Sequence, residues 1–429
     1  MKKNYFTLGL LSLIIIININ CGSDSGSGSV SVRYVGTSPM GYYEVIMNYN
    51  GDSDYHMGQL YGKTLVTQYP TLEARFADHF SNPGNFAVSY DTIMTRVQQI
   101  KNQIPQEYRD FLNGVASQYN GGTTNNKDDH VLSVDEVFYF SLLAVVNRSS
   151  QCSVMAVYNT ASDTGGPIIG RLLDWGFGTT STAVSYIKKG DKAFMNIGNT
   201  LLDQGIMTAL NKHGIFVAVL DSGRFGTAFP DLSSDTYYAY PLDLRYALEN
   251  YSTIDDIANY LSQKKYTYNH LILIGDSNTV KVLENDLEGT RALRDADSEL
   301  NTGITWGFPN AIGAVNAFLL KNNHDNFSAN TFNTYRWQSI KDQLNLYLSS
   351  DNKITVNEMK KITTYYGTDI NQQTDGIIMN NITQQIVIYD SKTPGLHVFF
   401  RNSRSIGTEN NETSFDVNNP EFLVIPVQF

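Results

Sequence analysis

The feature that most constrains the fold is a change of hydrophobic pattern at Cys152. After it, short runs rich in β-branched and aromatic residues follow one another with turn residues between them, which is typical of strands. The runs are CSVMAVY, PIIGRLLDW, AVSYIKK, AFMNIG, GIFVAVLD, HLILIGD and VKVLEN, then QQIVIYD and LHVFFR near the C-terminus. Helical spacing interrupts them at 242–250, at 252–261 with Ser252 as the expected cap, and at 334–348. The pattern predicts an α+β body over residues 152–429.

Residues 31–151 have a mainly helical pattern. YYEVIMNY is strand-like, but two stripes of apolar residues at helical spacing follow it on either side of Pro105, which we expect in the first turn of the second helix. Ser133 and Glu136 have the spacing of a capping box before VFYFSLLAVV, which is apolar on nearly all sides and predicts a buried helix. We therefore expect a helical front section that ends just before Cys152.

The N-terminus is typical of a targeting segment. Lys2 and Lys3 precede an apolar stretch, Thr7–Ile19, that is too short for the ~20 residues a spanning helix needs. Cys21 and the linker GSDSGSGS follow. The pattern resembles a bacterial lipoprotein signal, with residues 1–20 removed, Cys21 lipidated and 21–30 a flexible linker. We expect an exported cell-envelope lipoprotein anchored to the membrane through Cys21, with a plain secreted protein as the alternative.

The net charge limits the classes of molecule that the chain is expected to bind. The net charge is −11, which argues against a nucleic-acid partner because phosphate backbones are bound by clustered Lys and Arg. The segment 349–359 resembles half of a calcium-binding loop ending at Glu358, but it carries too few carboxylates to hold the ion. We expect a small-molecule partner and neither a metal nor another cofactor.

Cys152 heads a predicted hairpin. A turn centred on Asp163, within TASDTGG, would place Cys152 opposite Asp174 and Arg171 opposite Met155. In this pairing a thiol, a guanidinium and a carboxylate meet at one edge of a sheet. A nearby arginine stabilises the thiolate form of a cysteine, which is its nucleophilic form.

A base for this thiol is not evident among the histidines, because the seven in the chain form no motif. If the bond between Gln151 and Cys152 were cut, the new α-amine, with an ordinary pKa of about 8, would accept the thiol proton directly. A buried carboxylate such as Asp174 would hold that amine. The junction between the helical front and the strand-rich body is where such a cut is expected.

At these residues the sequence resembles the N-terminal nucleophile (Ntn) hydrolases of the choloylglycine hydrolase clan, and within it the isopenicillin N acyltransferase-like and acid ceramidase-like branch. The main resemblance is Cys152, a strand, a Gly-rich turn and GRLLDW. Looser similarities are DFLNGVASQY with LSVDEVFYFSLLAVV, LNKHGIFVAVLDSG, LRYALENYSTIDDIANYL, AVNAFLL and NTYRW. The resemblance covers most of residues 40–400. It implies a four-layer αββα sandwich and a prosegment, 31–151, that stays bound as a small subunit after cleavage.

The resemblance also implies roles for single residues. Cys152 would be the self-exposed nucleophile, and Arg171 and Asp174 would position the substrate and the amine. Asn316 would donate a side-chain N–H to the oxyanion, and Arg336 would support the site electrostatically. Asp221 stands where relatives often carry asparagine; its backbone N–H would serve the oxyanion, whereas an ionised side chain would repel it.

Each residue also has a structural interpretation without chemistry. Cys152 would be a small core residue, and Arg171 with Asp174 a cross-strand ion pair. Asn316 would be a turn or capping residue, with Asn310 as a competitor for its role, and Arg336 an exposed helix residue.

The functional hypothesis is an exported amidohydrolase or acyltransferase that cleaves a linear amide of an N-acyl substrate through an acyl-thioester on Cys152. One alternative is a non-catalytic surface lipoprotein that uses the same fold for binding or adhesion. Another is a Cys-His protease, which predicts activity without self-cleavage.

Overall fold

The computed structural model describes residues 27–36, 41–147, 151–175, 182–222, 229–349, 352–367, 377–380, 382–393, 395–401 and 420–429. The expected signal segment and Cys21 lie outside these ranges. Within the described residues, no helix is long and apolar enough to cross a membrane.

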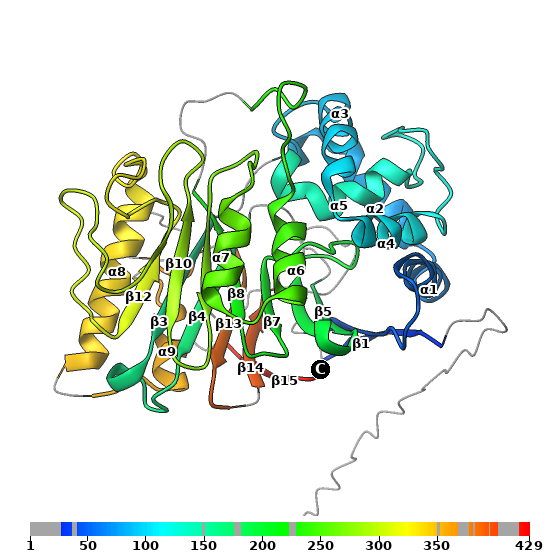
Figure 1. Cartoon of the computed structure of the whole chain (residues 1–429). Coiled ribbons are helices and arrows are strands. Elements are labelled where there is room, and N and C mark those ends of the chain that lie inside the picture. Colours follow the sequence, from blue (N-terminus) through cyan, green and yellow to red (C-terminus); the bar gives the residue numbers. More distant parts are fainter. Residues whose placement is uncertain are drawn as a thin grey trace, which may run out of the picture.

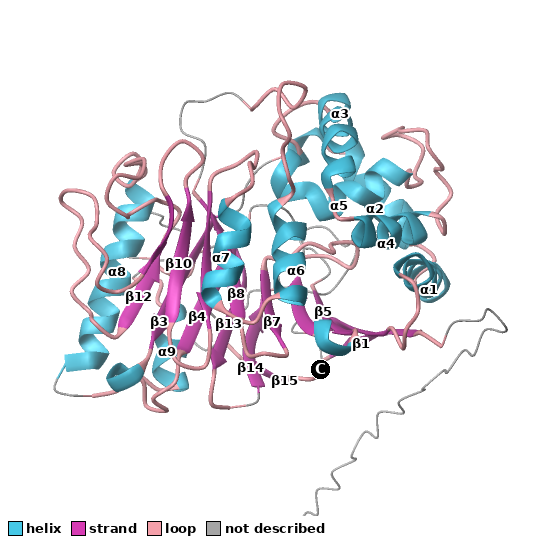
Figure 2. Cartoon of the chain, viewed as in Figure 1, coloured by secondary structure: helices cyan, strands magenta, loops and turns pink. Residues whose placement is uncertain are grey.

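Two β-sheets form the centre of the molecule (Figures 1 and 2). The larger has nine strands in the order β1-β2-β5-β6-β7-β8-β9-β10-β11, all antiparallel to their neighbours except the parallel pair β2–β5. Its strands are β1 (Ser29–Val35), β2 (Tyr42–Asn48), β5 (Ala183–Lys188), β6 (Phe194–Gly198), β7 (Thr208–Asn211), β8 (Phe216–Asp221), β9 (His270–Gly275), β10 (Val280–Asn285) and β11 (Arg291–Arg294).

The smaller sheet has six antiparallel strands in the order β12-β3-β4-β13-β14-β15. They are β12 (Ala311–Ala314), β3 (Gln151–Val157), β4 (Ile168–Asp174), β13 (Thr383–Asp390), β14 (Gly395–Phe400) and β15 (Leu423–Pro426). The strands β3 and β4 are the predicted hairpin, and they lie inside the sheet, with β12 on one side and β13 on the other.

Helices cover the outer faces of both sheets. Helices α6 (Tyr240–Asn250) and α7 (Ile254–Ser262) pack on the nine-stranded sheet, and α8 (Thr331–Leu348) and α9 (Val356–Thr363) pack on the six-stranded one. The inner faces meet where β3 contacts β8. The predicted α+β class and its four-layer αββα sandwich are therefore confirmed.

The front section carries five helices beside the β1–β2 edge of the larger sheet (Figure 1). They are α1 (Asp54–Gln68), α2 (Leu72–Ser81), α3 (Tyr90–Ile100), α4 (Gln106–Ala116) and α5 (Val134–Val146). The front section also contributes β1 and β2, and β2 pairs with β5 from Tyr43–Ala183 to Asn48–Lys188. The segment before Cys152 is thus built into the body's sheet.

The helix boundaries test the expected capping signals. Ser133 and Glu136 form the predicted capping box of α5, and nearly the whole helix is buried. Pro105 is the N-cap of α4 and so stands one position before the expected first turn. The cap of α7 is Thr253 and not Ser252, because the Thr253 hydroxyl reaches the backbone N–H of Asp256, three residues on.

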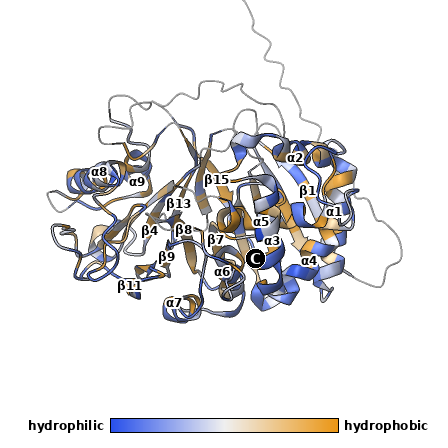
Figure 3. Ribbon diagram, turned by 90° about the horizontal axis from the view of Figure 1, so that it is seen from above, coloured by the Kyte–Doolittle hydropathy of each residue, from blue (hydrophilic) through white to orange (hydrophobic). Residues whose placement is uncertain are grey.

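Buried apolar side chains form two clusters. One lies between the sheets and continues into the front helices and under α6 and α7; the other lies between the smaller sheet and α8 and α9. In Figure 3 hydrophobic colours run through the central strands, and hydrophilic colours occur mainly on the surrounding helices and loops. Residues on either face of β3 and β4 are therefore removed from water.

Candidate active site

Cys152 lies at the start of β3, and its pairing differs from the prediction by one residue. Cys152 is opposite Leu173, Val154 is opposite Arg171, and Gln151 is opposite Asp174. The loop contains a 3₁₀ turn at Asn159–Ala161, where Asn159 has φ of 51°. The pairing centres the hairpin between Ser162 and Asp163 and not on Asp163. The predicted pairs Cys152–Asp174 and Arg171–Met155 are wrong.

This shift decides which side chains share a face. Because side chains alternate along a strand, Cys152 and Arg171 point to one face of the smaller sheet and Asp174 points to the other. The first face meets the larger sheet, where Arg171 Nη2 donates to the carbonyl of Val219 in β8 at 3.2 Å. The second meets α8. The three groups lie at one end of the hairpin, as expected, but Arg171 and not Asp174 shares the face of Cys152.

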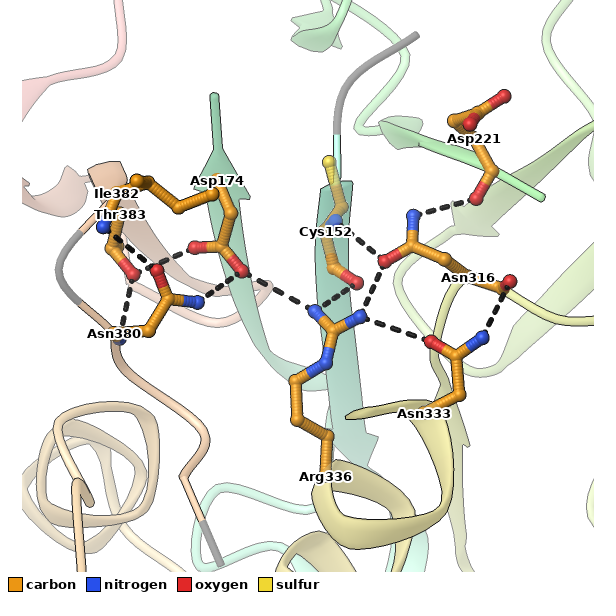
Figure 4. Close-up of polar contacts among 9 residues, drawn as sticks. All are labelled: Cys152, Asp174, Asp221, Asn316, Asn333, Arg336, Asn380, Ile382 and Thr383. Carbon is orange, nitrogen blue, oxygen red and sulfur yellow. Dashed lines mark hydrogen bonds and ion pairs between the residues drawn. The ribbon is translucent and has the colours of Figure 1, made fainter. Parts of the chain in front are cut away.

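The backbone of Cys152 is held from two directions (Figure 4). Its N–H donates to Asn316 Oδ1 at 2.8 Å, and its carbonyl accepts from Arg336 Nη1 at 2.9 Å. Asn316 follows β12, whose ladder with β3 ends at Ala314–Val154, so the side chain takes over where strand pairing stops. Asn316 is the central residue of a tight γ-turn closed by Ala317 N and Val315 O at 2.7 Å.

Arg336 connects the parts of the site. The interpretation as an exposed helix residue is wrong, because its side chain is 1% exposed. Besides the Cys152 carbonyl, its guanidinium donates to Asp174 Oδ2 at 3.3 Å, to Asn316 Oδ1 at 2.6 Å and to Asn333 Oδ1 at 3.1 Å. Burial lowers the pKa of Arg336, and the charges of Asp174 and Cys152 act in the opposite direction.

Asp174 accepts hydrogen bonds on both carboxylate oxygens. Thr383 Oγ1 donates to Oδ1 at 2.6 Å, and Asn380 Nδ2 donates to Oδ2 at 2.9 Å, beside the ion pair with Arg336. Burial raises the pKa of Asp174, while Arg336 and the two hydrogen-bond donors oppose that shift. A cross-strand ion pair of Asp174 with Arg171 is not what forms, since the two side chains lie on opposite faces. Asp174 reaches the Cys152 backbone through Arg336.

Arg171 is a fully buried cation beside the thiol. Burial lowers its pKa, and the charges of Cys152 and Asp174 and a side-chain hydrogen bond with Cys152 act in the opposite direction. Removing an isolated charge from water is costly unless an opposite charge or donors and acceptors compensate. The arrangement therefore favours a negative charge on Cys152.

Asn316 and Asp221 are joined through the Asp221 backbone. Asn316 Nδ2 donates to the Asp221 carbonyl at 2.6 Å, while Oδ1 accepts from the Cys152 amide and Arg336. Two donors facing Oδ1 and one carbonyl facing Nδ2 fix the orientation of this amide. One of the two Nδ2 hydrogens is used by the Asp221 carbonyl.

Asn310, the competitor of Asn316, lies at the other end of β3. Its carbonyl accepts from Tyr158 N, and its side chain donates to Thr160. Tyr158 lies six positions after Cys152 along an extended segment, roughly 20 Å away. Asn310 lines a cavity of about 410 Å³ there, so it does not belong to the site at Cys152.

His270 lies close to the site but both of its ring nitrogens are used. It pairs with Asp221 across β8 and β9. Nε2 faces Asn285 Nδ2, an amide donor, at 3.1 Å, so Nδ1 carries the proton toward Tyr268 O at 3.0 Å. Burial lowers the pKa of His270 to about 4. This ring is a neutral core group stacked on Tyr240 and does not supply a base for Cys152.

The segment that leads to Cys152 is also anchored. The last carbonyls of α5 accept hydrogen bonds from side chains of other elements: Val145 from Thr267 at 2.7 Å, Val146 from Arg96 at 2.8 Å, and Asn147 from the Tyr268 hydroxyl at 3.0 Å. Helix ends leave such carbonyls without intrahelical partners. The body thus holds the front section four residues before the predicted cut.

Sequence reasoning missed three polar residues of the site. Asn333 lies one turn before Arg336 on α8, and also donates to the Asn316 carbonyl at 2.9 Å. Asn380 and Thr383 hold Asp174 from the start of β13. The i, i+3 spacing of Asn333 and Arg336 was a usable signal. The pairing of Thr383 with Asp174 depends on strand order, which the sequence did not reveal.

The described residues contain no cluster of three or more histidine, cysteine, aspartate or glutamate side chains suited to a metal ion. Glu358, the last residue of the calcium-like segment, instead forms the capping box of α9 with Thr355.

No family model and no curated protein matches this sequence. Among solved structures, it is similar to an N-acylethanolamine-hydrolyzing acid amidase ortholog of Caenorhabditis elegans, with 14% identity, 57% of this chain and 94% of that chain covered, and a TM-score of 0.37. For penicillin V acylase from Agrobacterium tumefaciens the values are 12%, 58%, 83% and 0.34. For a mutant of conjugated bile acid hydrolase from Clostridium perfringens they are 11%, 65%, 97% and 0.35.

These three structures all have TM-scores below 0.5, so they assign no residue, substrate or reaction to this chain. Its chemistry is inferred from the contacts described above.

Proposed function

We propose that the chain is a self-processing cysteine amidohydrolase that cleaves the linear amide bond of an N-acyl substrate. The observation that carries this proposal is the fixed backbone of Cys152: Asn316 binds its nitrogen and Arg336 its carbonyl, while Arg171 lies on the side-chain face. A buried core cysteine needs none of these groups.

Self-processing begins from the uncut chain. Cys152 Sγ attacks the Gln151 carbonyl carbon, a C–S bond forms, and the C–N bond breaks as the thiol proton passes to the departing nitrogen. Water then hydrolyses the thioester, which leaves a carboxylate on Gln151 and restores the thiol. Cys152 becomes the first residue of a new chain, and its nitrogen becomes an α-amine that Asn316 Oδ1 is placed to bind.

In turnover, the α-amine takes the thiol proton and the thiolate attacks the substrate carbonyl. The second Nδ2 hydrogen of Asn316 and the backbone N–H of Asp221 are the proposed oxyanion donors, each contributing a few kcal/mol to the transition state. Arg171 stabilises the thiolate. Asp174 and Arg336 keep the Cys152 backbone in place. The amine product leaves with the proton, and water or a second amine takes the acyl group.

A denaturing gel tests the proposal. The wild type should give two fragments, and Cys152→Ala one intact band. Ser153→Ala is the matched control, because Ser153 is the next residue of the strand, equally buried, with its side chain on the opposite face. It should be cut like the wild type. An uncut, inactive wild type would favour the binding lipoprotein, and an uncut but active one would favour the Cys-His protease. The contacts of His270 argue against the protease, because both of its ring nitrogens already have hydrogen-bond partners.

The acyl group and the amine of the substrate can be identified by measuring amine release from a panel of N-acyl amides. The panel starts with N-acylethanolamines, penicillin V and conjugated bile acids, the compounds in the names of the similar structures. Ceramides, N-acyl amino acids and acyl-homoserine lactones extend it. Competing amines in the assay distinguish acyl transfer from hydrolysis.

The proposed place of action is the bacterial cell envelope, with a lipid on Cys21. Metabolic labelling with a fatty-acid analogue should mark the wild type and not Cys21→Ala. Labelling of neither protein would favour a secreted form.

A further inference from the structure

A buried ion pair lies beside the turn that carries Asn316. Glu284 is in β10 and Arg294 in β11, with Nε and Oε1 2.8 Å apart. Both side chains are 1% exposed or less. Neither residue touches Cys152 through a described contact, so the pair is separate from the groups assigned above.

The pair binds both flanks of the turn. Arg294 Nη2 donates to the carbonyl of Gly313, three residues before Asn316, at 2.7 Å. Glu284 accepts from Leu319 N, three residues after Asn316, at 3.1 Å on Oε1 and 3.0 Å on Oε2. It also accepts from Leu320 N and Asn323 Nδ2, each at 3.0 Å.

These contacts supply hydrogen-bond partners to backbone groups next to the turn. β12 ends at Ala314, and no described strand or helix contains residues 315–323. Buried N–H groups without a partner cost free energy, about 1–3 kcal/mol each. Glu284 satisfies two of them and so fixes where the chain leaves the γ-turn, while Arg294 fixes where it enters.

We propose that Glu284 and Arg294 are positioning residues for the reaction: they set the place of Asn316 and, through it, of the Cys152 nitrogen. This inference rests on the proposed function. Asn316 Oδ1 lies 2.8 Å from that nitrogen and 2.6 Å from Arg336. A displacement of about 1 Å in such a group can reduce the rate 100-fold.

A matched control exists in the same chain. Arg245 and Glu249 form a second buried ion pair, 2.9 Å apart, with side chains 1% and 0% exposed. They lie one turn apart within α6, and their described hydrogen bonds reach Gln204 and not the Asn316 turn. Loss of either pair disturbs a buried charge, but only one pair holds Asn316.

The experiment compares Glu284→Gln with Glu249→Gln in the full chain, with amine release from the best substrate of the panel as the assay. Glu284→Gln should lower kcat about tenfold or more and leave KM within about twofold. Both variants should lower the melting temperature by similar amounts, but Glu249→Gln should keep the wild-type kcat. Arg294→Lys is the second variant if Glu284→Gln does not fold: it keeps a cation for Glu284 but has no second arm for Gly313.

A readout independent of turnover completes the test. In the uncut Cys152→Ala background, Glu284→Gln or Arg294→Lys should speed amide hydrogen exchange in 313–323, and Glu249→Gln should not. Wild-type kcat and exchange in both Glu284→Gln and Arg294→Lys would overturn the inference and leave the proposed function standing. A wild type with neither self-cleavage nor turnover would instead contradict the proposed function.

Discussion

Arg336 Nη1 lies 2.9 Å from the carbonyl oxygen of Cys152, a residue 184 positions earlier in the chain. The same guanidinium binds the Asp174 carboxylate and the Asn316 amide. Three elements of the smaller sheet's end, β3, β4 and the turn after β12, are thus joined by one side chain of α8. This contact explains how a carboxylate on the far face of the hairpin is linked to the backbone of the proposed nucleophile, Cys152.

Replacing the guanidinium of Arg336 should lower kcat much more than it changes KM. Arg336→Lys keeps the charge but cannot bind four acceptors from one planar group. We expect kcat to fall about 100-fold with little change in KM, because the geometry at Cys152 is lost. The control is Lys341→Gln, a half-buried position on the same helix whose ammonium binds Thr305. Near wild-type kcat in Arg336→Lys would show that the contacts to Cys152 and Asn316 are dispensable.

The anchoring of α5 predicts an effect on self-cleavage alone. Tyr268→Phe removes the hydroxyl that binds the Asn147 carbonyl, a bond worth about 0.5–1.5 kcal/mol. Self-cleavage, followed on gels after synthesis, should slow about three- to tenfold, and the kcat of cut protein should be unchanged. Tyr186→Phe is the control, since its hydroxyl binds the Pro426 carbonyl at 3.0 Å away from the cut. Equal cleavage rates in the two variants would argue against the anchor.

The two fragments of the cut chain should stay associated in one molecule. β2 is paired along its length with β5, the Tyr61 hydroxyl donates to Leu201 O, and Arg245 stacks on Tyr108 at 4.6 Å. Size-exclusion chromatography of cut protein should give one peak containing both fragments, at the volume of uncut Cys152→Ala. Denaturant should be needed to part them. Separate elution in native buffer would contradict retention of residues 31–151 as a small subunit.

His270 predicts a pH dependence of stability. Its pKa is about 4 in the folded chain against 6.5 as the ordinary value, so the unfolded chain binds more protons between these limits. The free energy of unfolding should therefore fall as the pH is lowered from 6.5 to 4, by about 3 kcal/mol from this residue. Urea unfolding at several pH values measures this slope. His270→Phe should flatten this slope.

Local patterns predicted most elements of the body, because the predicted strands were bounded by turn residues and a helix such as α7 had a clear apolar stripe. The order of the strands in each sheet and their exact pairing could not be predicted from the sequence. The observed pairing of the hairpin differs from the predicted one by one residue, and a one-residue shift exchanges the faces of the side chains of one strand relative to the other. For that reason Cys152, Arg171 and Asp174 were correctly grouped at one end of the hairpin, but the predicted pairing put Asp174 on the face of Cys152, where Arg171 lies instead.

The remaining site residues come from distant segments. Asn316 and Arg336 were named by resemblance, and their contacts with Cys152 depend on how β12 and α8 pack on the sheet. Asn380 and Thr383 reach Asp174 only because β13 pairs with β4. Glu284 and Arg294 act from the other sheet, and their charges gave no sign in the sequence that they would be buried together.

The most direct measurement is the intact mass and N-terminal sequence of the chains in purified, active protein. We expect a chain whose first residue is Cys152, carrying an unblocked α-amine, together with a front fragment that ends at Gln151. Active material composed only of chain that is continuous through this bond would contradict the self-processing mechanism.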